Sequence, residues 1–298
     1  MSMVLALLLL GQPAPAGAPA DALQLVQQGR RAVAEGKHAE GLALYEKALA
    51  AQPQLPEAHL GAGIVLDLMG EYSRAREHLT KAIEQASPEL RSNALQAMAV
   101  SHAFERHAPE AARFFQQIYD ANVEGGQFAA AAGTANALGR LYLEVGDTKQ
   151  ARRWYETGYE MARRQPDEPG SQLALWRFRW LHALGRIAAR EGKSAEARKQ
   201  VAAARELVEA TPSLKEEGPT LAYLAGYVEL HLKNYATART ELARADQEDP
   251  FILMLQAQAA EKAGDPTAAR GFWEKALESN AHSLQNAFAR PLAKKAVR

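Results

Sequence analysis

The stretch ALGRLYLEVGDTKQARRWYE, residues 137–156, places small residues and one large aromatic residue at fixed distances from a glycine. Gly139 lies seven residues before Gly146, and Ala151 and Tyr155 follow that glycine at five and nine residues. A step of four returns to the same face of an α-helix, so the side chains of Ala151 and Tyr155 would point the same way. The stretch therefore predicts two helices joined by a tight turn, with small residues where they cross and a bulky side chain between them.

The same offsets recur along most of the chain. Seven stretches align when they are placed on their turn positions, which are Gly36, Gly70, Arg106, Gly146, Gly192, Lys233 and Gly264. The large residues nine positions later are Tyr45, Leu79, Phe115, Tyr155, Val201, Leu242 and Trp273. The small residues seven positions earlier are Gly29, Gly63, Ala99, Gly139, Gly185, Gly226 and Ala257. Seven copies predict a repeat array in place of a single globular core.

This pattern resembles the tetratricopeptide repeat from residue 22 to about residue 281. The resemblance implies an all-α fold, a right-handed α-solenoid of about seven helix-turn-helix repeats. We expect an N-terminal segment at 1–20, the repeat array at 21–281 and a C-terminal capping helix at 282–298. The first two turn positions are separated by 34 residues, close to the family's period, whereas longer intervals later predict joints at 119–127, 163–172 and 209–219.

Composition limits the classes of function. The chain has 298 residues, of which 47% are hydrophobic, and its 35 basic residues balance its 35 acidic ones. This balance argues against a dedicated nucleic-acid binder, whose affinity comes largely from neutralising phosphates. The chain has no cysteine, which excludes disulfides, thiolate metal sites and cysteine nucleophiles.

The N-terminus resembles a secretory signal peptide. The apolar run VLALLLL at 4–10 is followed by small residues, with cleavage sites expected after Ala16 or Ala20. No Lys or Arg precedes the apolar run, so a disordered or mis-started N-terminus stays as the alternative. We expect an exported chain, periplasmic or secreted and of bacterial origin, if the segment is cleaved, and a cytoplasmic one if it is not.

The family resemblance implies that the first helix of each repeat lines a concave groove. The residues that it assigns to partner binding are Leu60, Ile64, Leu68, Val100, Phe104, Arg140, Arg179, His182, Arg186, Arg190, Tyr223 and Tyr227. The groove would change from apolar through basic to aromatic. Residues 137–205 carry 14 basic and 8 acidic residues, which favours a partner with acidic character, although these charges could equally serve only to solvate outer helices.

Other kinds of site find little support. His102, Glu105 and His107 do not share one helical face and lack the HExxH spacing, so we expect no metal there. The stretch LWRFRW at 175–180 could stack on nucleobases, but Trp176 and Trp180 are one turn apart and fit better as packing residues. We found no catalytic motif, and we expect no cofactor.

The sequence thus favours a non-enzymatic scaffold that binds a partner peptide or helix, as an exported assembly factor or adaptor. A cytoplasmic regulator is the main alternative. An RNA-binding helical repeat and an enzyme with an unrecognised site are the further alternatives, because a fold alone does not fix a function.

Overall fold

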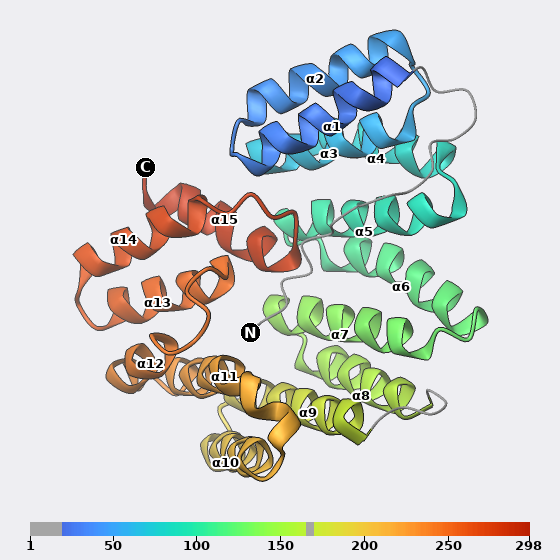
Figure 1. The fold of residues 1–298 in the computed structure, drawn as a ribbon. Coiled ribbons are helices and arrows are strands. Elements are labelled where there is room, and N and C mark those ends of the chain that lie inside the picture. The colour runs from blue at the N-terminus through green and yellow to red at the C-terminus, as the bar shows by residue number, and fades with distance from the viewer. Residues whose placement is uncertain (1–19, 165–169) are drawn as a thin grey trace. The chain divides into compact units, whose positions relative to one another are not determined.

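The computed structural model describes residues 20–164 and 170–298, which form α-helices and one 3₁₀ helix and contain no strand (Figure 1). The predicted signal peptide lies outside the described residues, apart from its last residue. The helices are α1 (Ala20–Ala34), α2 (His38–Ala51), α3 (Pro56–Met69), α4 (Tyr72–Gln85), α5 (Pro88–Phe104), α6 (Ala108–Glu124), α7 (Phe128–Val145) and α8 (Thr148–Arg164). They continue with α9 (Gly170–Arg190), α10 (Ser194–Ala210), the 3₁₀ helix η1 (Pro212–Glu217), α11 (Gly218–His231), α12 (Tyr235–Leu242), α13 (Pro250–Lys262), α14 (Pro266–Leu277) and α15 (Leu284–Ala296).

The predicted repeats are confirmed as seven helix pairs, α1/α2 to α13/α14, followed by α15. Every predicted turn position has a positive φ, including the two that are not glycine, Arg106 at 61° and Lys233 at 66°. A left-handed residue at this point lets the chain reverse after the first helix and satisfies carbonyls at its end. At Gly146, for example, the backbone N–H donates to the carbonyl of Leu143.

Close contact between paired helices depends on the small residues that the repeat pattern contains. A Cβ atom added to Gly139 on α7 would lie 2.7 Å from the ring of Tyr155 on α8. A Cβ added to Gly63 on α3 would lie 2.6 Å from Leu79 on α4. Since real Cβ atoms do not approach so closely, each large side chain fits only because its partner is small.

The described chain divides into two compact units. Of the described residues, one unit contains 20–118 and 280–287, and the other contains 119–164, 170–279 and 288–298. Within the first unit α1 contacts α3, and α3 contacts α5. Within the second unit α9 contacts α11, and α11 contacts α13. The first helices of successive repeats therefore lie against one another from α1 to α5 and from α9 to α13.

The C-terminal part of the first unit returns to residues far earlier in the chain. His282 Nε2 lies 2.8 Å from Asp67 Oδ2, and the hydroxyl of Ser101 donates to Asp67 Oδ1 at 2.8 Å. Asn280 Nδ2 donates to the carbonyl of Ala34 at 3.3 Å. Because Asp67 and Ser101 are buried, residues 280–287 complete the polar interior of this unit.

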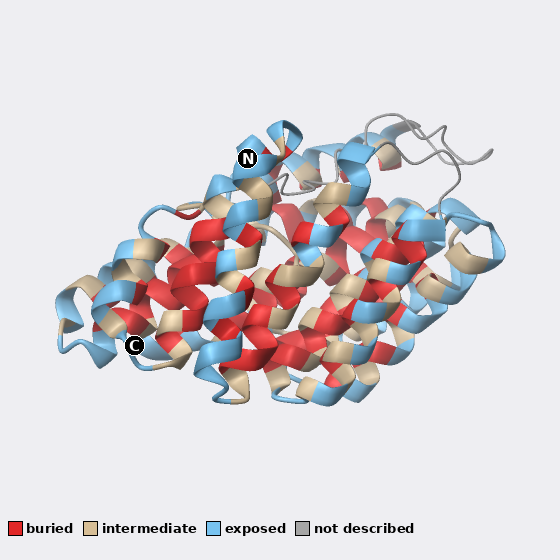
Figure 2. Ribbon diagram, turned by 90° about the horizontal axis from the view of Figure 1, so that it is seen from below, coloured by how far each residue is buried: buried red, intermediate tan, exposed pale blue. Residues whose placement is uncertain are grey.

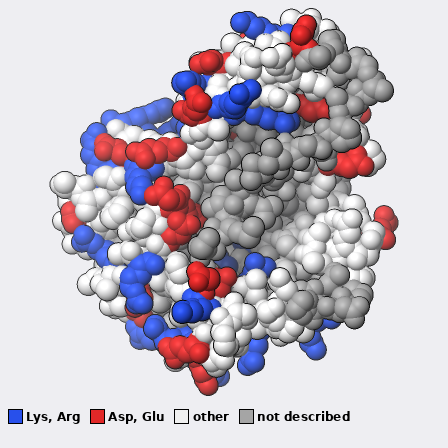
Figure 3. Space-filling model, viewed as in Figure 1, with Lys and Arg blue, Asp and Glu red and all other residues white. Residues whose placement is uncertain are grey.

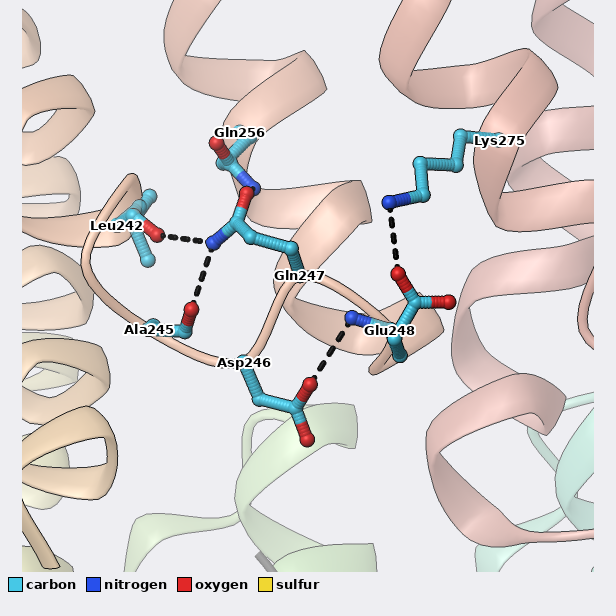
Figure 4. Close-up of polar contacts among 7 residues, drawn as sticks. All are labelled: Leu242, Ala245, Asp246, Gln247, Glu248, Gln256 and Lys275. Carbon is cyan, nitrogen blue, oxygen red and sulfur yellow. Dashed lines mark hydrogen bonds and ion pairs between the residues drawn. The ribbon is translucent and has the colours of Figure 1, made fainter. Parts of the chain in front are cut away.

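The sixth repeat has the shortest second helix of the described chain. After α12 ends, Gln247 donates from its amide to the carbonyls of Leu242 at 2.9 Å and Ala245 at 2.7 Å (Figure 4). The buried Gln256 on α13 in turn donates to Gln247 Oε1 at 3.0 Å. Gln247 thus satisfies carbonyls that another helical turn would otherwise have occupied, and Gln256 holds Gln247 in place.

The buried residues follow the helix faces that meet neighbouring helices, while loops and outer faces are exposed (Figure 2). The predicted joint at 209–219 contains η1, and the predicted joint at 119–127 is helical as far as Glu124, where α6 ends. Both joints are therefore more ordered than an open loop. Part of the joint at 163–172 lies outside the described residues. Within the described chain, every helix is too short or too polar to cross a membrane.

Lys233 offers a test of the turn geometry. We expect Lys233→Gly to stabilise the protein by about 0.5–1 kcal/mol, because relief of left-handed strain exceeds the entropic cost of glycine. Lys199 is an equally exposed lysine within α10 and serves as the control. Lys199→Gly should instead destabilise the protein by about 1 kcal/mol. Urea unfolding of both variants measures the two effects, and destabilisation of equal size at both positions would contradict the assigned turn.

Candidate functional site

The most polar part of the interior lies in the unit that contains residues 119–279. Arg140 projects from α7, and Arg186 and Arg190 project from α9, one helical turn apart. Arg186 is only 4% exposed, whereas Arg140 and Arg190 are partly exposed. Such burial is unusual for arginine and requires hydrogen-bonding partners.

Two tyrosines supply those partners for Arg140 and Arg186. The hydroxyl of Tyr223, on α11, accepts from Arg140 Nη2 at 3.1 Å and from Arg186 Nη1 at 3.3 Å. Arg186 Nη2 also donates to the hydroxyl of Tyr155 at 2.8 Å. We call these four residues, Arg140, Tyr155, Arg186 and Tyr223, the Arg–Tyr cluster. It joins side chains from three successive repeats.

Aromatic rings surround the two guanidinium groups. Arg140 lies 4.9 Å from the centre of the Phe251 ring on α13, and Arg186 lies 5.4 Å from that of Tyr155 and 5.9 Å from that of Tyr227. The negative faces of these rings attract a cation, and the attraction is stronger where water is excluded. The rings thus offset part of the cost of burying the charges.

Arg190 has a different environment. Its Nη2 donates to the carbonyls of Leu143 at 2.7 Å and Glu144 at 3.1 Å, at the C-terminal end of α7. A guanidinium at this position also complements the negative end of the helix dipole. Its Nη1 lies 3.3 Å from His231 Nε2. Arg190 therefore holds α7 and α11 together and is not part of the Arg–Tyr cluster.

The histidines beside these arginines are held neutral. Burial, and then the charges of Arg186 and Arg140, keep the pKa of His182 well below its usual value. Burial lowers the pKa of His231 to about 4, and the hydrogen bond to the carbonyl of Tyr227 opposes this shift only in part. Because His231 Nδ1 donates to that carbonyl, its Nε2 is the nitrogen that accepts from Arg190.

The nearby carboxylates are engaged elsewhere. Asp249 accepts from the backbone N–H of Phe251 at 2.8 Å as the N-cap of α13, and Glu144 Oε1 accepts from the hydroxyl of Tyr227 at 3.5 Å. Among the ion pairs of the described residues, none involves Arg140 or Arg186. Three buried nitrogens in this region lack a hydrogen-bond partner in the described chain: Arg140 Nη1, Arg186 Nε and His182 Nε2.

The predicted apolar groove residues lie on α3 and α5 of the other unit. Leu60 packs with Leu79 and Leu90 in a core cluster, and Ile64 packs against that cluster while partly exposed. Leu68, Val100 and Phe104 are at most 3% exposed. The ring of Phe104 stacks on Tyr72 and contacts His282. A role in partner binding for these five residues stays a prediction.

The remaining residues on α9 separate into packing and surface positions. Trp176 packs against Ala131 and Met161, as expected for a side chain that faces the neighbouring repeat, and Trp180 stacks on Tyr159. Arg179 is exposed, with its guanidinium 4.7 Å from the Trp176 ring, and does not reach the Arg–Tyr cluster. A tryptophan that is packed in this way has no free face for a nucleobase.

Two groups with catalytic residue types do not have catalytic geometry. In Ser101, Asp67 and His282, both the serine and the histidine contact the carboxylate, so no imidazole accepts the serine proton. Glu105 pairs with Arg76 at 2.7 Å, while the ring of His102 stacks on Phe114. No group of three or more potential metal ligands occurs among the described residues.

Surface charge gives no second candidate. On the face shown in Figure 3, Lys and Arg side chains are interspersed with Asp and Glu side chains over the described residues. Pairs such as Arg198 with Glu229, 3.0 Å apart, and Lys275 with Glu248, 2.9 Å apart, contribute to this mixing. The face shown in Figure 3 therefore carries no uniform basic patch over the described residues.

Sequence reasoning found some of the site residues and missed others. It placed Arg140, Arg186 and Tyr223 on first helices, and the structure brings them together. It assigned Tyr155 only to packing, although that hydroxyl also accepts from Arg186. It did not single out Glu144, although that residue follows Arg140 by four positions on α7.

Comparison with known proteins identifies the class to which this arrangement belongs. Tetratricopeptide repeat families match residues 32–99, 132–165 and 182–251. The chain belongs to the tetratricopeptide repeat proteins. No curated protein sequence matches it.

Several solved structures share the fold at low sequence identity. A tetratricopeptide repeat protein from Parabacteroides merdae ATCC 43184 has a TM-score of 0.55 at 12% identity, covering 93% of this chain and 97% of that one. The apo form of RapI has a TM-score of 0.56 at 13% identity, with 92% and 99% covered. A Rap protein complexed with Competence and Sporulation Factor has a TM-score of 0.52 at 12% identity, with 93% and 76% covered. At these identities the comparisons show the fold alone.

The lowered pKa of His231 predicts a loss of stability in acid. Between the ordinary value of 6.5 and about 4, the unfolded chain binds a proton that the folded chain does not. This contribution is therefore fully present above pH 6.5 and decreases as the pH falls towards 4. We expect His231→Gln to show a shallower fall in the free energy of unfolding over that range, measured by urea unfolding at several pH values. Identical pH profiles for the variant and the wild type would contradict the assigned environment.

Proposed function

We propose that this chain is a non-enzymatic scaffold that binds an extended segment or a helix of a partner protein on the first helices of its repeats. The observation that carries this proposal is the meeting of side chains from α7, α9 and α11 at the Arg–Tyr cluster. Because three repeats contribute to it, the cluster can contact several points of one elongated partner. Adjacent repeats in such arrays typically share one binding surface.

The chemistry of the cluster favours holding over reaction. Arginine stays protonated at all accessible pH values, and burial raises the pKa of Tyr155. His182 has a lowered pKa and lies beside two cations. Among the described residues, no nucleophile is in hydrogen-bonding contact with it. A general acid or base needs a pKa near the working pH and a reacting group within reach, and the cluster offers neither.

The complex of a Rap protein with Competence and Sporulation Factor gives an example of this fold with a bound factor. We take from it only that an array of similar architecture can hold a partner. The identity of the factor carries nothing over to this chain, because the two sequences are 12% identical.

Peptide selection tests the scaffold directly. The purified full chain is screened against a displayed library of random peptides, and the selected peptide is followed by hydrogen exchange. We expect slower exchange in α7, α9 and α11, with little change in α10 and α12. Arg140→Glu should weaken binding of the selected peptide by at least about tenfold, since it replaces a donor by a repelling charge.

Arg177→Glu is the matched control, because Arg177 is an exposed arginine on α9 away from the cluster. It should bind the selected peptide as the wild type does. Failure to enrich any peptide, or protection confined to α10 and α12, would overturn the proposed function.

We propose in addition that the chain is exported, on the basis of its N-terminal sequence. The apolar run at 4–10 and the small residues up to Ala20 support this proposal. Intact mass analysis of the protein from its native host should give a chain that begins at Gly17 or Asp21. A chain that retains residues 1–20 would favour the alternative of a cytoplasmic regulator.

A further inference from the structure

We propose that the Arg–Tyr cluster is a binding site for one carboxylate group of the partner, an inference that rests on the proposed scaffold function. The cluster contains two guanidinium groups whose hydrogen-bonding partners within the described chain are neutral hydroxyls. The site would fix the position of the partner along the first helices. It differs from a general attraction to acidic surfaces because particular atoms are left without partners.

The buried arginines of the cluster have no anionic partner at ion-pair distance among the described residues. Arg186 is almost completely buried and has no carboxylate within ion-pair distance in the described chain. A buried guanidinium ordinarily has an anionic partner, because removing a charge from water is costly. Glu144 acts electrostatically on Arg186 and Asp249 on Arg140, but Glu144 accepts from Tyr227 and Asp249 caps the N-terminus of α13.

The cluster also contains hydrogen-bond donors that have no acceptor in the part of the chain that the structure describes. Arg140 Nη1 and Arg186 Nε each carry an N–H group without an acceptor in the described chain. Both lone pairs of the Tyr223 hydroxyl are used by the two arginines, so its own proton is left to donate. These donors belong to residues that already meet at one oxygen atom. These three donors are therefore without an acceptor within the cluster.

A carboxylate group of the partner matches these donors in number and charge. The two oxygens of a carboxylate offer about four lone pairs, enough for the three donors. Hydrogen bonds from a guanidinium to a carboxylate are roughly twice as strong as those between neutral groups. Since the proposed partner is a polypeptide, its anionic groups are Asp or Glu side chains or the C-terminal carboxylate. Arg140 is partly exposed as a residue, while its unpartnered Nη1 is buried.

The positive charge of the two guanidinium groups explains why a neutral group would fit less well. His182, whose ring lies 4.9 Å from that of Tyr223, has a pKa well below its usual value and adds no charge to the site. A neutral amide offers one oxygen to the donors and no negative charge. A carboxylate offers two oxygens and a charge opposite to that of the arginines, so the site should discriminate between an acid and its amide.

Small probes test the site independently of any partner. The four probes are N-acetylalanine and its neutral amide, and the α-amides of N-acetylglutamate and N-acetylglutamine. Each is titrated into the full chain, and the arginine Nε–H resonances are followed by NMR. We expect at least one of the two carboxylates to shift the Arg186 resonance in a saturable manner and both amides to leave it unchanged. The tighter of the two acids shows whether a C-terminal or a side-chain carboxylate is preferred.

Variants separate the site from nonspecific effects. Arg140→Gln and Tyr223→Phe each remove a donor while keeping most of the side-chain shape, and each should weaken carboxylate binding by about tenfold. Arg177→Gln should bind as the wild type does. Circular dichroism and thermal unfolding confirm that each variant is folded before its affinity is compared.

The outcomes distinguish the two proposals. If neither acid shifts the Arg186 resonance, or if acids and amides shift it equally, the carboxylate site is overturned even when peptides are selected by the chain. If the acids bind but peptide selection fails, the site is supported and the scaffold function is overturned. Unchanged affinity in both Arg140→Gln and Tyr223→Phe would also overturn the assignment of the donors.

Discussion

The contact between a large side chain on one helix and a small residue on its partner is the constraint on which each repeat depends. Tyr155 lies against Gly139 so closely that a single added Cβ atom would overlap its ring. Protein interiors are packed like crystals, so this contact fixes the separation of the two helices. That separation in turn places α7, α9 and α11 near enough for their longer side chains to meet.

The Arg–Tyr cluster is a consequence of this packing. Tyr155 fills the gap within one helix pair with its ring, while its hydroxyl accepts from Arg186 of the next repeat. Tyr223 then joins Arg186 to Arg140. One set of aromatic residues thereby serves both to pack the repeats and to hold two cations in a region with little water. This arrangement links the stability of the array to the chemistry of its candidate site.

The structure also shows where regular repetition stops. After the short helix α12, Gln247 satisfies carbonyls that a longer helix would have used, and Gln256 donates to the side chain of Gln247. After the last repeat, residues 280–287 belong with the first repeats, where His282 contacts Asp67. Neither feature follows the repeat pattern, because each compensates for a local departure from it. They illustrate that an array of similar units still needs individual solutions at its irregular points.

The sequence alone determined the helix pairs, their seven turns and the side chains that pack between them. These features depend on spacings of three, four and seven residues, which the geometry of one helix or one turn imposes. Even Arg106 and Lys233, which lack the expected glycine, were identified by their place in the pattern. The tertiary structure decided that Phe104 is buried, that Arg190 caps α7 and that Arg140, Arg186 and Tyr223 share one hydroxyl. The physical reason is that the hydrogen bonds among them join residues 37 to 83 positions apart in the sequence. How close such residues lie in space depends on how successive repeats stack and not on any local period.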